Sequence, residues 1–214
     1  MSLTTETTGI LAEASSLEIG DLKRMTVEQY EEMARLGVLD DPRVELINGF
    51  LVKKMTQRPW HSSTVGVLEE LLRGMMPDGW HLRTEQPIRL PDYDEPEPDL
   101  AIARGKAGDY RRRHPGAQDV AMVIEVSESI LRVDRGDKLR AYARGGIPEY
   151  WIVNLVDRRI EAHRSPSSNG YASTTIHDPS ARITVRVDGV ERGEIAVAEV
   201  LPEIDTEEAG PPPR

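Results

Sequence analysis

Three charged side chains stand where a chemical site would need them. Asp99 follows a proline directly before the apolar run 100–103, Glu125 lies 26 residues later inside another apolar run, and Lys138 follows after 13 more. Two carboxylates can hold Mg²⁺, which polarises a phosphodiester and lowers the pKa of a bound water, while a nearby ammonium positions that water or stabilises negative charge. The order of these residues therefore indicates metal-assisted hydrolysis of a phosphodiester.

Glu125 is the least expected of the three, because it interrupts the apolar stretch 120–127, VAMVIEVS. An apolar run without alternation is typical of a strand covered on both faces. An unpaired carboxylate in such a strand would cost several kcal/mol. Glu125 therefore sits at the strand's end facing a cation or pairs with a basic side chain. The alternative is an edge strand with Glu125 in solvent.

The segment after this strand could deliver the cation. Residues 134–146 predict a helix that is closed by the glycine pair Gly145-Gly146. Lys138 and Tyr142 are four residues apart, so they share one face of the helix. The Lys138 ammonium would then lie near the preceding strand, although a helical lysine is more commonly solvated.

Asp99 closes the acidic segment 92–99, which leads into the strand expected at 100–103. Acidic loops are usually solvated. Here, however, Pro98 fixes the backbone just before a short buried strand. We therefore expect Asp99 at the entrance of the strand rather than in a free loop.

Upstream, residues 43–52 predict a β-hairpin, because Asn48-Gly49 suits the two positive-φ positions of a type I′ turn. Glu45 lies on the first strand of this hairpin. A single acidic residue on a half-exposed hairpin usually means little, so a function for Glu45 depends on its context.

Helices are expected on both sides of the hairpin. A capping-box signal at Thr26 predicts the first helix. The apolar spacing within 61–76 predicts another, with Ser62 or Ser63 as its cap and His61 at its start. Further strands are expected at 80–90, 147–154, 159–163, 170–176 and 183–187.

The composition indicates a soluble globular protein, with 38% hydrophobic and 30% charged residues. We expect one domain over 25–200, between a flexible tail (1–24) and an acidic, proline-rich tail (201–214). The sequence has no run of eighteen apolar residues, so we expect a cytoplasmic protein without membrane contact. Because cysteine is absent, carboxylates and five histidines remain as metal ligands, which favours Mg²⁺ or Mn²⁺ over structural zinc.

The net charge of -10 argues against nonspecific coating of nucleic acid, since polyanions repel one another. Residues 104–114 differ from this average, because they carry five basic side chains and one carboxylate. Within them Arg111, Arg112 and Arg113 are candidates for phosphate contacts. A solvated loop is the alternative interpretation.

The sequence resembles the putative restriction endonuclease family of the PD-(D/E)XK nuclease superfamily over about residues 25–165. The stretches that carry the resemblance are 44–49 (VELING), His61, 97–99 (EPD), 124–127 (IEVS), Asp134 with Lys138 and Tyr142, and 148–153 (PEYWIV). The resemblance implies a restriction-endonuclease-like α/β fold, in which helices flank a mixed β-sheet with additional β-hairpins.

The resemblance also implies roles for individual residues. Asp99 and Glu125 would be metal ligands, with the Val126 carbonyl as a further ligand and Glu45 as an additional acidic contributor. Where the superfamily pattern has a lysine, two positions after the acidic residue, this chain has Ser127.

In some members that lysine is relocated to the next helix, and Lys138 looks like such a residue. His61 and Tyr142 are candidate supports of the site. These residues together predict a Mg²⁺-dependent endonuclease that cuts DNA and acts as a homodimer, since nucleases that cut both strands often pair two active sites.

Two other functions are compatible with the sequence. The nuclease-like fold could serve as a catalytically inactive module that binds nucleic acid or protein, which the net acidity and Ser127 favour. Glycoside hydrolysis by the clustered carboxylates is the third, but the chain lacks a flanking aromatic platform for a sugar.

Overall fold

A six-stranded mixed β-sheet forms the centre of the computed structural model, which describes residues 22–39, 41, 43–54, 56–128 and 131–203. The strands lie in the order β3-β4-β5-β6-β7-β8, and only β5 and β6 are parallel neighbours. Their bounds are Trp80–Thr84 (β3), Leu100–Arg104 (β4), Val120–Ser127 (β5), Glu149–Asn154 (β6), Arg159–Ser167 (β7) and Gly170–His177 (β8). This sheet confirms the predicted α/β class.

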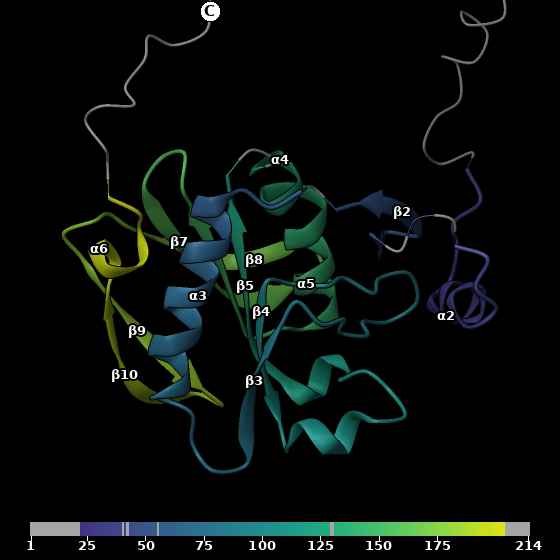
Figure 1. Cartoon of the computed structure of the whole chain (residues 1–214), viewed down its shortest axis with the longest axis horizontal. Helices are drawn as coiled ribbons and strands as arrows, with labels where there is room; N and C mark the ends of the chain where they lie inside the picture. Colours follow the sequence, from purple (N-terminus) through teal and green to yellow (C-terminus); the bar gives the residue numbers. More distant parts are fainter. Residues whose placement is uncertain (1–21, 40, 42, 55, 129–130, 204–214) are drawn as a thin grey trace, which may run out of the picture.

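Helices cover both faces of the sheet (Figure 1). The long helix α3 (Pro59–Arg73) packs on one face together with the hairpin β9 (Arg182–Val187) and β10 (Val190–Ala196) and the short helix α6 (Val197–Val200). On the other face lies α5 (Leu139–Gly145), which follows α4 (Leu131–Val133) and a π-helical turn, η5 (Asp134–Lys138). The sheet is therefore buried from both sides.

The two faces explain the composition of β5. Met122, Ile124 and Val126 pack in the core on the α3 side, whereas Val123 packs against α5. Every residue of this strand is buried, because β4 and β6 flank it within the sheet. The edge-strand alternative is thus wrong, and Glu125 keeps only 4% of its surface exposed.

The predicted hairpin is present as β1 (Val44–Ile47) and β2 (Phe50–Lys53), with positive φ angles of 53° at Asn48 and 81° at Gly49. It lies beside α2 (Val27–Arg35), whose N-cap Thr26 makes the predicted capping box. The short 3₁₀ helices η3 (Ala107–Tyr110) and η4 (Ala117–Asp119) connect β4 to β5.

Several expected boundaries were wrong. Helix α3 begins at Pro59 with Arg58 as its N-cap, so neither Ser62 nor Ser63 caps it; proline suits the first helical position because its φ is fixed and it needs no N–H partner. Strand β3 ends at Thr84, since Glu85 adopts a φ of 50°.

No sequence pattern indicated the π-helical turn over 134–138, and the helix begins earlier, at Leu131. Strand β10 and α6 were also not predicted. No helix in the described part of the chain is long and apolar enough to cross a membrane. Most of the expected tails, 1–21 and 204–214, lies outside the described residues.

Candidate active site

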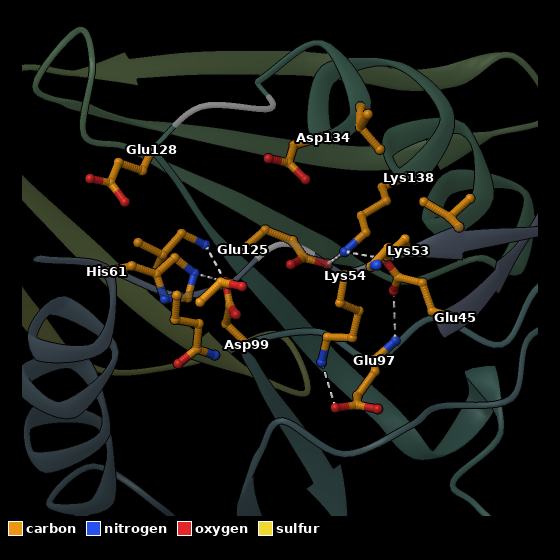
Figure 2. A pocket seen from close by; sticks show the side chains of 15 residues that line it. Glu45, Lys53, Lys54, His61, Glu97, Asp99, Glu125, Glu128, Asp134 and Lys138 are labelled. Carbon is orange, nitrogen blue, oxygen red and sulfur yellow. Dashed lines mark hydrogen bonds and ion pairs between the residues drawn. The ribbon is translucent and has the colours of Figure 1, made fainter. Parts of the chain in front are cut away.

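Lys138 reaches Glu125 from the face of the sheet that α5 covers. Successive side chains of a strand alternate between faces, so Glu125 and Ser127 point to the opposite side from Ile124 and Val126. The Lys138 ammonium lies 2.9 Å from Oε1 of Glu125 (Figure 2), and the Tyr142 hydroxyl donates a 2.6 Å hydrogen bond to the same oxygen. The predicted shared face of Lys138 and Tyr142 is thus directed at Glu125.

The π-helical turn delivers Lys138 together with a second charged residue. Asp134 and Lys138 are the ends of this turn, both are buried, and both line the same pocket. Single π turns inside α-helices are rare and often lie at functional sites. Asp134 belongs to the stretch that resembles the nuclease family, although the sequence alone gave it no role.

Glu45 binds Lys138 from the opposite direction. Its Oε1 lies 3.0 Å from the ammonium, and its Oε2 accepts a 3.0 Å hydrogen bond from the Glu97 backbone N–H. The residue is only 4% exposed, because the hairpin pairs with the acidic segment through the bridge between Leu46 and Glu95. The half-exposed position expected for Glu45 was therefore wrong.

Asp99 lies at the entrance of β4, and its side chain contacts two other elements. Its Oδ2 accepts a 2.7 Å hydrogen bond from the Val126 N–H and lies 3.2 Å from Nε2 of His61, in the first turn of α3. Figure 2 shows His61 and Asp99 side by side in the pocket that also contains Glu125. His61 Nδ1 is buried without a hydrogen-bond partner among the described residues.

Burial and neighbouring charges perturb these groups strongly. Burial raises the pKa of Glu125, and the positive charge of Lys138 only partly opposes this effect. Burial lowers the pKa of Lys138, but the negative charges of Glu125 and Glu45 outweigh it and hold that pKa well above its ordinary value. Lys138 is therefore a permanent cation at neutral pH, and such perturbed groups in a cleft are typical of functional sites.

The rim of the pocket carries cationic residues that the sequence analysis did not identify. Lys53 ends the hairpin strand β2 and Lys54 follows it; Lys54 donates a 2.5 Å hydrogen bond to Glu97. Lys53 is 66% exposed at its side chain. Two consecutive lysines after an apolar strand were the only signal in the sequence, and only the docking of the hairpin brings them to the pocket.

Arg111, Arg112 and Arg113 do not line this pocket. They follow η3, which comes after the far end of β4, whereas Asp99 precedes its near end. All three arginines are exposed, and Arg113 forms a 2.6 Å ion pair with Asp119. The structure thus separates the basic segment from the group of Asp99, Glu125 and Lys138.

The side chains of the pocket suit a metal ion that keeps bound waters better than one held entirely by protein ligands. Among the described residues no three His, Cys, Asp or Glu side chains form a group that could hold a metal. Mg²⁺ is commonly bound by one or two carboxylates, with waters and substrate phosphates as its other ligands. In the described part of the chain no hydrogen bond reaches Oδ1 of Asp99 or Oε2 of Glu125. The pair therefore fits Mg²⁺ or Mn²⁺, and it does not form an all-protein cage.

The position of the Val126 carbonyl is consistent with a metal ion bound at Asp99 and Glu125. Within a strand, the N–H and C=O of one residue point to the same side. The Val126 N–H donates to Asp99, beyond the last residue of β5 that pairs with β4, which is Ile124. Its carbonyl oxygen is therefore directed to the side where Asp99 lies, and Val126 lines the pocket.

Comparison with known proteins shows the family of this chain. The family model described as "Uma2: Putative restriction endonuclease" matches residues 27–197, which is most of the chain. The protein belongs to the Uma2 family. All the residues of the pocket fall within the matched range. No curated protein matches the sequence.

A solved structure supports the fold assignment independently. The crystal structure of a putative nuclease belonging to DUF820 from Anabaena variabilis ATCC 29413 is similar with a TM-score of 0.63 and 13% sequence identity. The similarity covers 82% of this chain and 97% of the other. At this identity the comparison shows a shared fold, so the Uma2 protein described here has the architecture of a nuclease-like protein.

Proposed function

We propose that this Uma2 protein is a Mg²⁺-dependent endonuclease that hydrolyses phosphodiester bonds of DNA, with Mn²⁺ as an alternative metal. The observation that carries the proposal is the contact of the Lys138 ammonium with Glu125, in a pocket that also holds Asp99. Membership of the Uma2 family supports a nuclease. The identity of the metal and the choice of DNA as the substrate are proposed here.

Asp99, Glu125 and the Val126 carbonyl would hold the metal. A bound Mg²⁺ supplies a polarised phosphoryl oxygen and a water with a lowered pKa. The described hydrogen bonds occupy Oδ2 of Asp99 and Oε1 of Glu125 and leave the second oxygen of each carboxylate for the ion.

Lys138 would act on the reacting groups through its ammonium. Its charge stabilises the negative charge that develops on the phosphoryl group, and its N–H donors orient the attacking water. Lys138 would take the role of the lysine that the superfamily pattern has at position 127, because Ser127 and Glu125 share the face that Lys138 approaches.

Three residues would position the others. Both oxygens of Glu45 accept hydrogen bonds or ion pairs, so Glu45 fixes the Lys138 ammonium rather than meeting the substrate. The Tyr142 hydroxyl holds the Glu125 carboxylate, and His61 holds Asp99 from α3. Lys53 and Lys54 at the rim would contact backbone phosphates of the DNA.

A catalytically inactive binding module is the second candidate. Ser127 stands where the superfamily pattern has its lysine, and Oε1 of Glu125 already receives Lys138 and Tyr142. A salt bridge that needs no metal could fill this pocket as a purely structural device. The two functions differ in whether the pocket binds a divalent cation, which calorimetric titration with Mn²⁺ measures.

Cleavage of supercoiled plasmid and of single-stranded DNA tests the proposal. The wild-type protein should nick or linearise DNA with Mg²⁺ or Mn²⁺, and chelation by EDTA should stop it. Glu125→Ala should lose the activity, whereas Glu70→Gln, an exposed carboxylate on α3, should retain it. Equal cleavage by the wild type and Glu125→Ala would refute the assignment.

The proposed homodimer would place two such sites on opposite strands of one duplex. Sedimentation velocity would report the mass in solution. Linear plasmid formed directly, without a nicked intermediate, would agree with a dimer that cuts both strands. A monomer that produces only nicks would contradict the dimer and leave the chemistry of the site unaffected.

A further inference from the structure

Arg83 on β3 is a buried cation for which the described residues supply no carboxylate. It keeps 6% of its surface exposed and is the only arginine among the described residues that is classed as buried. Its Nη2 donates a 3.3 Å hydrogen bond to the Pro87 carbonyl, and its Nε has no partner in the described part of the chain. No Asp or Glu of that part forms an ion pair with it.

This situation is costly and unlike that of the other arginines near the core. A buried charge is usually paired, because removing it from water without a partner costs several kcal/mol. Arginine cannot escape the cost by losing its proton in a protein. Arg135 pairs with Glu161, and Arg164 lies 2.7 Å from Glu149. Arg83 is therefore a buried cation whose charge an anion from outside the chain would neutralise.

The surroundings of Arg83 are basic and aromatic. The guanidinium carbon of Arg83 lies 5.5 Å from the centre of the Tyr110 ring, and that of Arg113 lies 5.1 Å from the same centre. The Tyr110 hydroxyl donates a 2.7 Å hydrogen bond to the Arg104 carbonyl, which fixes the ring that both guanidinium groups approach. Arg111 and Arg112 are exposed on the same turn and have no ion pair among the described residues.

The nearby acidic side chains form their contacts with groups other than Arg83. Asp109 Oδ2 accepts a 2.8 Å hydrogen bond from the Lys106 N–H. Asp119 Oδ2 lies 2.6 Å from Arg113 and accepts a 2.9 Å hydrogen bond from the Gly116 N–H. Burial, and then the charge of Arg83, lowers the pKa of His114. Asp119 therefore neutralises Arg113, whereas Arg83, Arg111 and Arg112 have no ion pair within the described chain.

We propose that Arg83 and the turn Arg111–Arg113 form a binding site for a phosphate group, separate from the catalytic pocket. Arginine suits this role because its planar fork of donors matches phosphate oxygens. The phosphate belongs to a nucleic-acid backbone or to a free phosphate compound. The site requires no metal and no cleavage, so it does not depend on the nuclease function.

The position of the site favours the nucleic-acid source. Strand β4 leads from Asp99 in the pocket to Arg104 beside Tyr110, and five residues of a strand span roughly 17 Å. About five base pairs of duplex cover that distance. Figure 1 shows the segment between β4 and β5 at the end of the sheet away from α4, so a bound strand could contact both regions.

Thermal unfolding in inorganic phosphate tests the site without nucleic acid. At matched ionic strength, replacing chloride by phosphate should raise the Tm of the wild type by about 3 °C or more. Arg83→Met should lose this shift, whereas Arg73→Met, an exposed arginine on α3, should keep it. The double variant Arg111→Gln and Arg112→Gln should reduce the shift, and because both residues are exposed it avoids any folding defect of Arg83→Met.

Binding of labelled oligonucleotides in EDTA distinguishes the two sources. If the ligand is a backbone phosphate, Arg83→Met should reduce the magnitude of the slope of log affinity against log salt by about 0.9 on duplex DNA. A phosphate-dependent Tm with an unchanged slope would identify a free phosphate compound instead. A wild-type Tm that phosphate leaves unchanged, or an equal shift in Arg83→Met, would overturn the site. Because EDTA prevents metal-dependent cleavage, an inactive catalytic pocket would not alter these outcomes.

Discussion

The ammonium of Lys138 lies 2.9 Å from Oε1 of Glu125, within the interior of the protein. The same cation is 3.0 Å from Glu45, so one positive charge serves two buried carboxylates from separate strands. This arrangement links the stability of the fold to the chemistry of the pocket, since removing the cation leaves two buried carboxylates without their ion-pair partner.

Lys138→Met should therefore destabilise the protein by about 3–5 kcal/mol at neutral pH, because the buried carboxylates of Glu125 and Glu45 would lose their cation and would have to stay buried without it or take up protons. Urea unfolding measures this loss. Lys53→Met removes an exposed lysine of the same pocket and should change the free energy of unfolding by less than about 0.5 kcal/mol. Similar effects of the two variants would show that Lys138 does not neutralise the buried carboxylates.

Tyr142→Phe should shift the pH dependence of catalysis. The Tyr142 hydroxyl donates to Glu125, and a donor favours the charged form of a carboxylate. Its loss should raise the pKa of Glu125 further, so that the rise of activity with pH moves to higher pH. Rates of plasmid nicking, measured between pH 5 and 9 in steps of about one pH unit, report this shift.

The matched control is Tyr171→Phe, which removes a hydroxyl bonded to the Ile147 carbonyl outside the pocket. Both variants should lose about 1 kcal/mol of stability. A pH profile that is unchanged in Tyr142→Phe, or shifted equally in Tyr171→Phe, would argue against a positioning role for Tyr142.

Glu161 should support stability down to strongly acid pH. Burial raises its pKa, but hydrogen bonds from Arg135, Asn154 and Arg159 outweigh burial and lower the pKa to about 2. A carboxylate with a lowered pKa in the folded state stabilises it above the unfolded pKa, near 4.5, and that contribution is lost as pH falls toward 2. The shift corresponds to about 3 kcal/mol.

Glu161→Gln should remove this part of the acid dependence. Chemical unfolding at several pH values between 7 and 2.5 should give a flatter curve for the variant than for the wild type. Glu70→Gln, which changes an exposed carboxylate, should reproduce the wild-type curve. Parallel curves for Glu161→Gln and the wild type would contradict the assigned contribution.

The sequence predicted the local parts of the site well. The apolar run around Glu125 identified a strand covered on both faces, and the spacing of Lys138 and Tyr142 placed them on one helix face. These properties depend on residues close in the chain. The partners of Glu125 followed because a buried carboxylate needs a cation or a donor.

Contacts between distant segments were beyond the reach of sequence patterns. The burial of Glu45 depends on pairing between β1 and the acidic segment near Glu95, which no local period encodes. The same docking brings Lys54 to the pocket. Arg83 shows no unusual local pattern, because its lack of a carboxylate partner is a property of the folded surroundings.

Calorimetric titration with Mn²⁺ tests the central claim most directly, namely that Asp99 and Glu125 jointly hold a divalent cation. The wild type should bind one Mn²⁺, and Asp99→Asn should weaken binding by about tenfold or more, which is about 1.4 kcal/mol. Glu70→Gln should bind as the wild type does. Equal Mn²⁺ binding by the wild type and Asp99→Asn, or no measurable binding by the wild type, would contradict the metal site and favour a binding module.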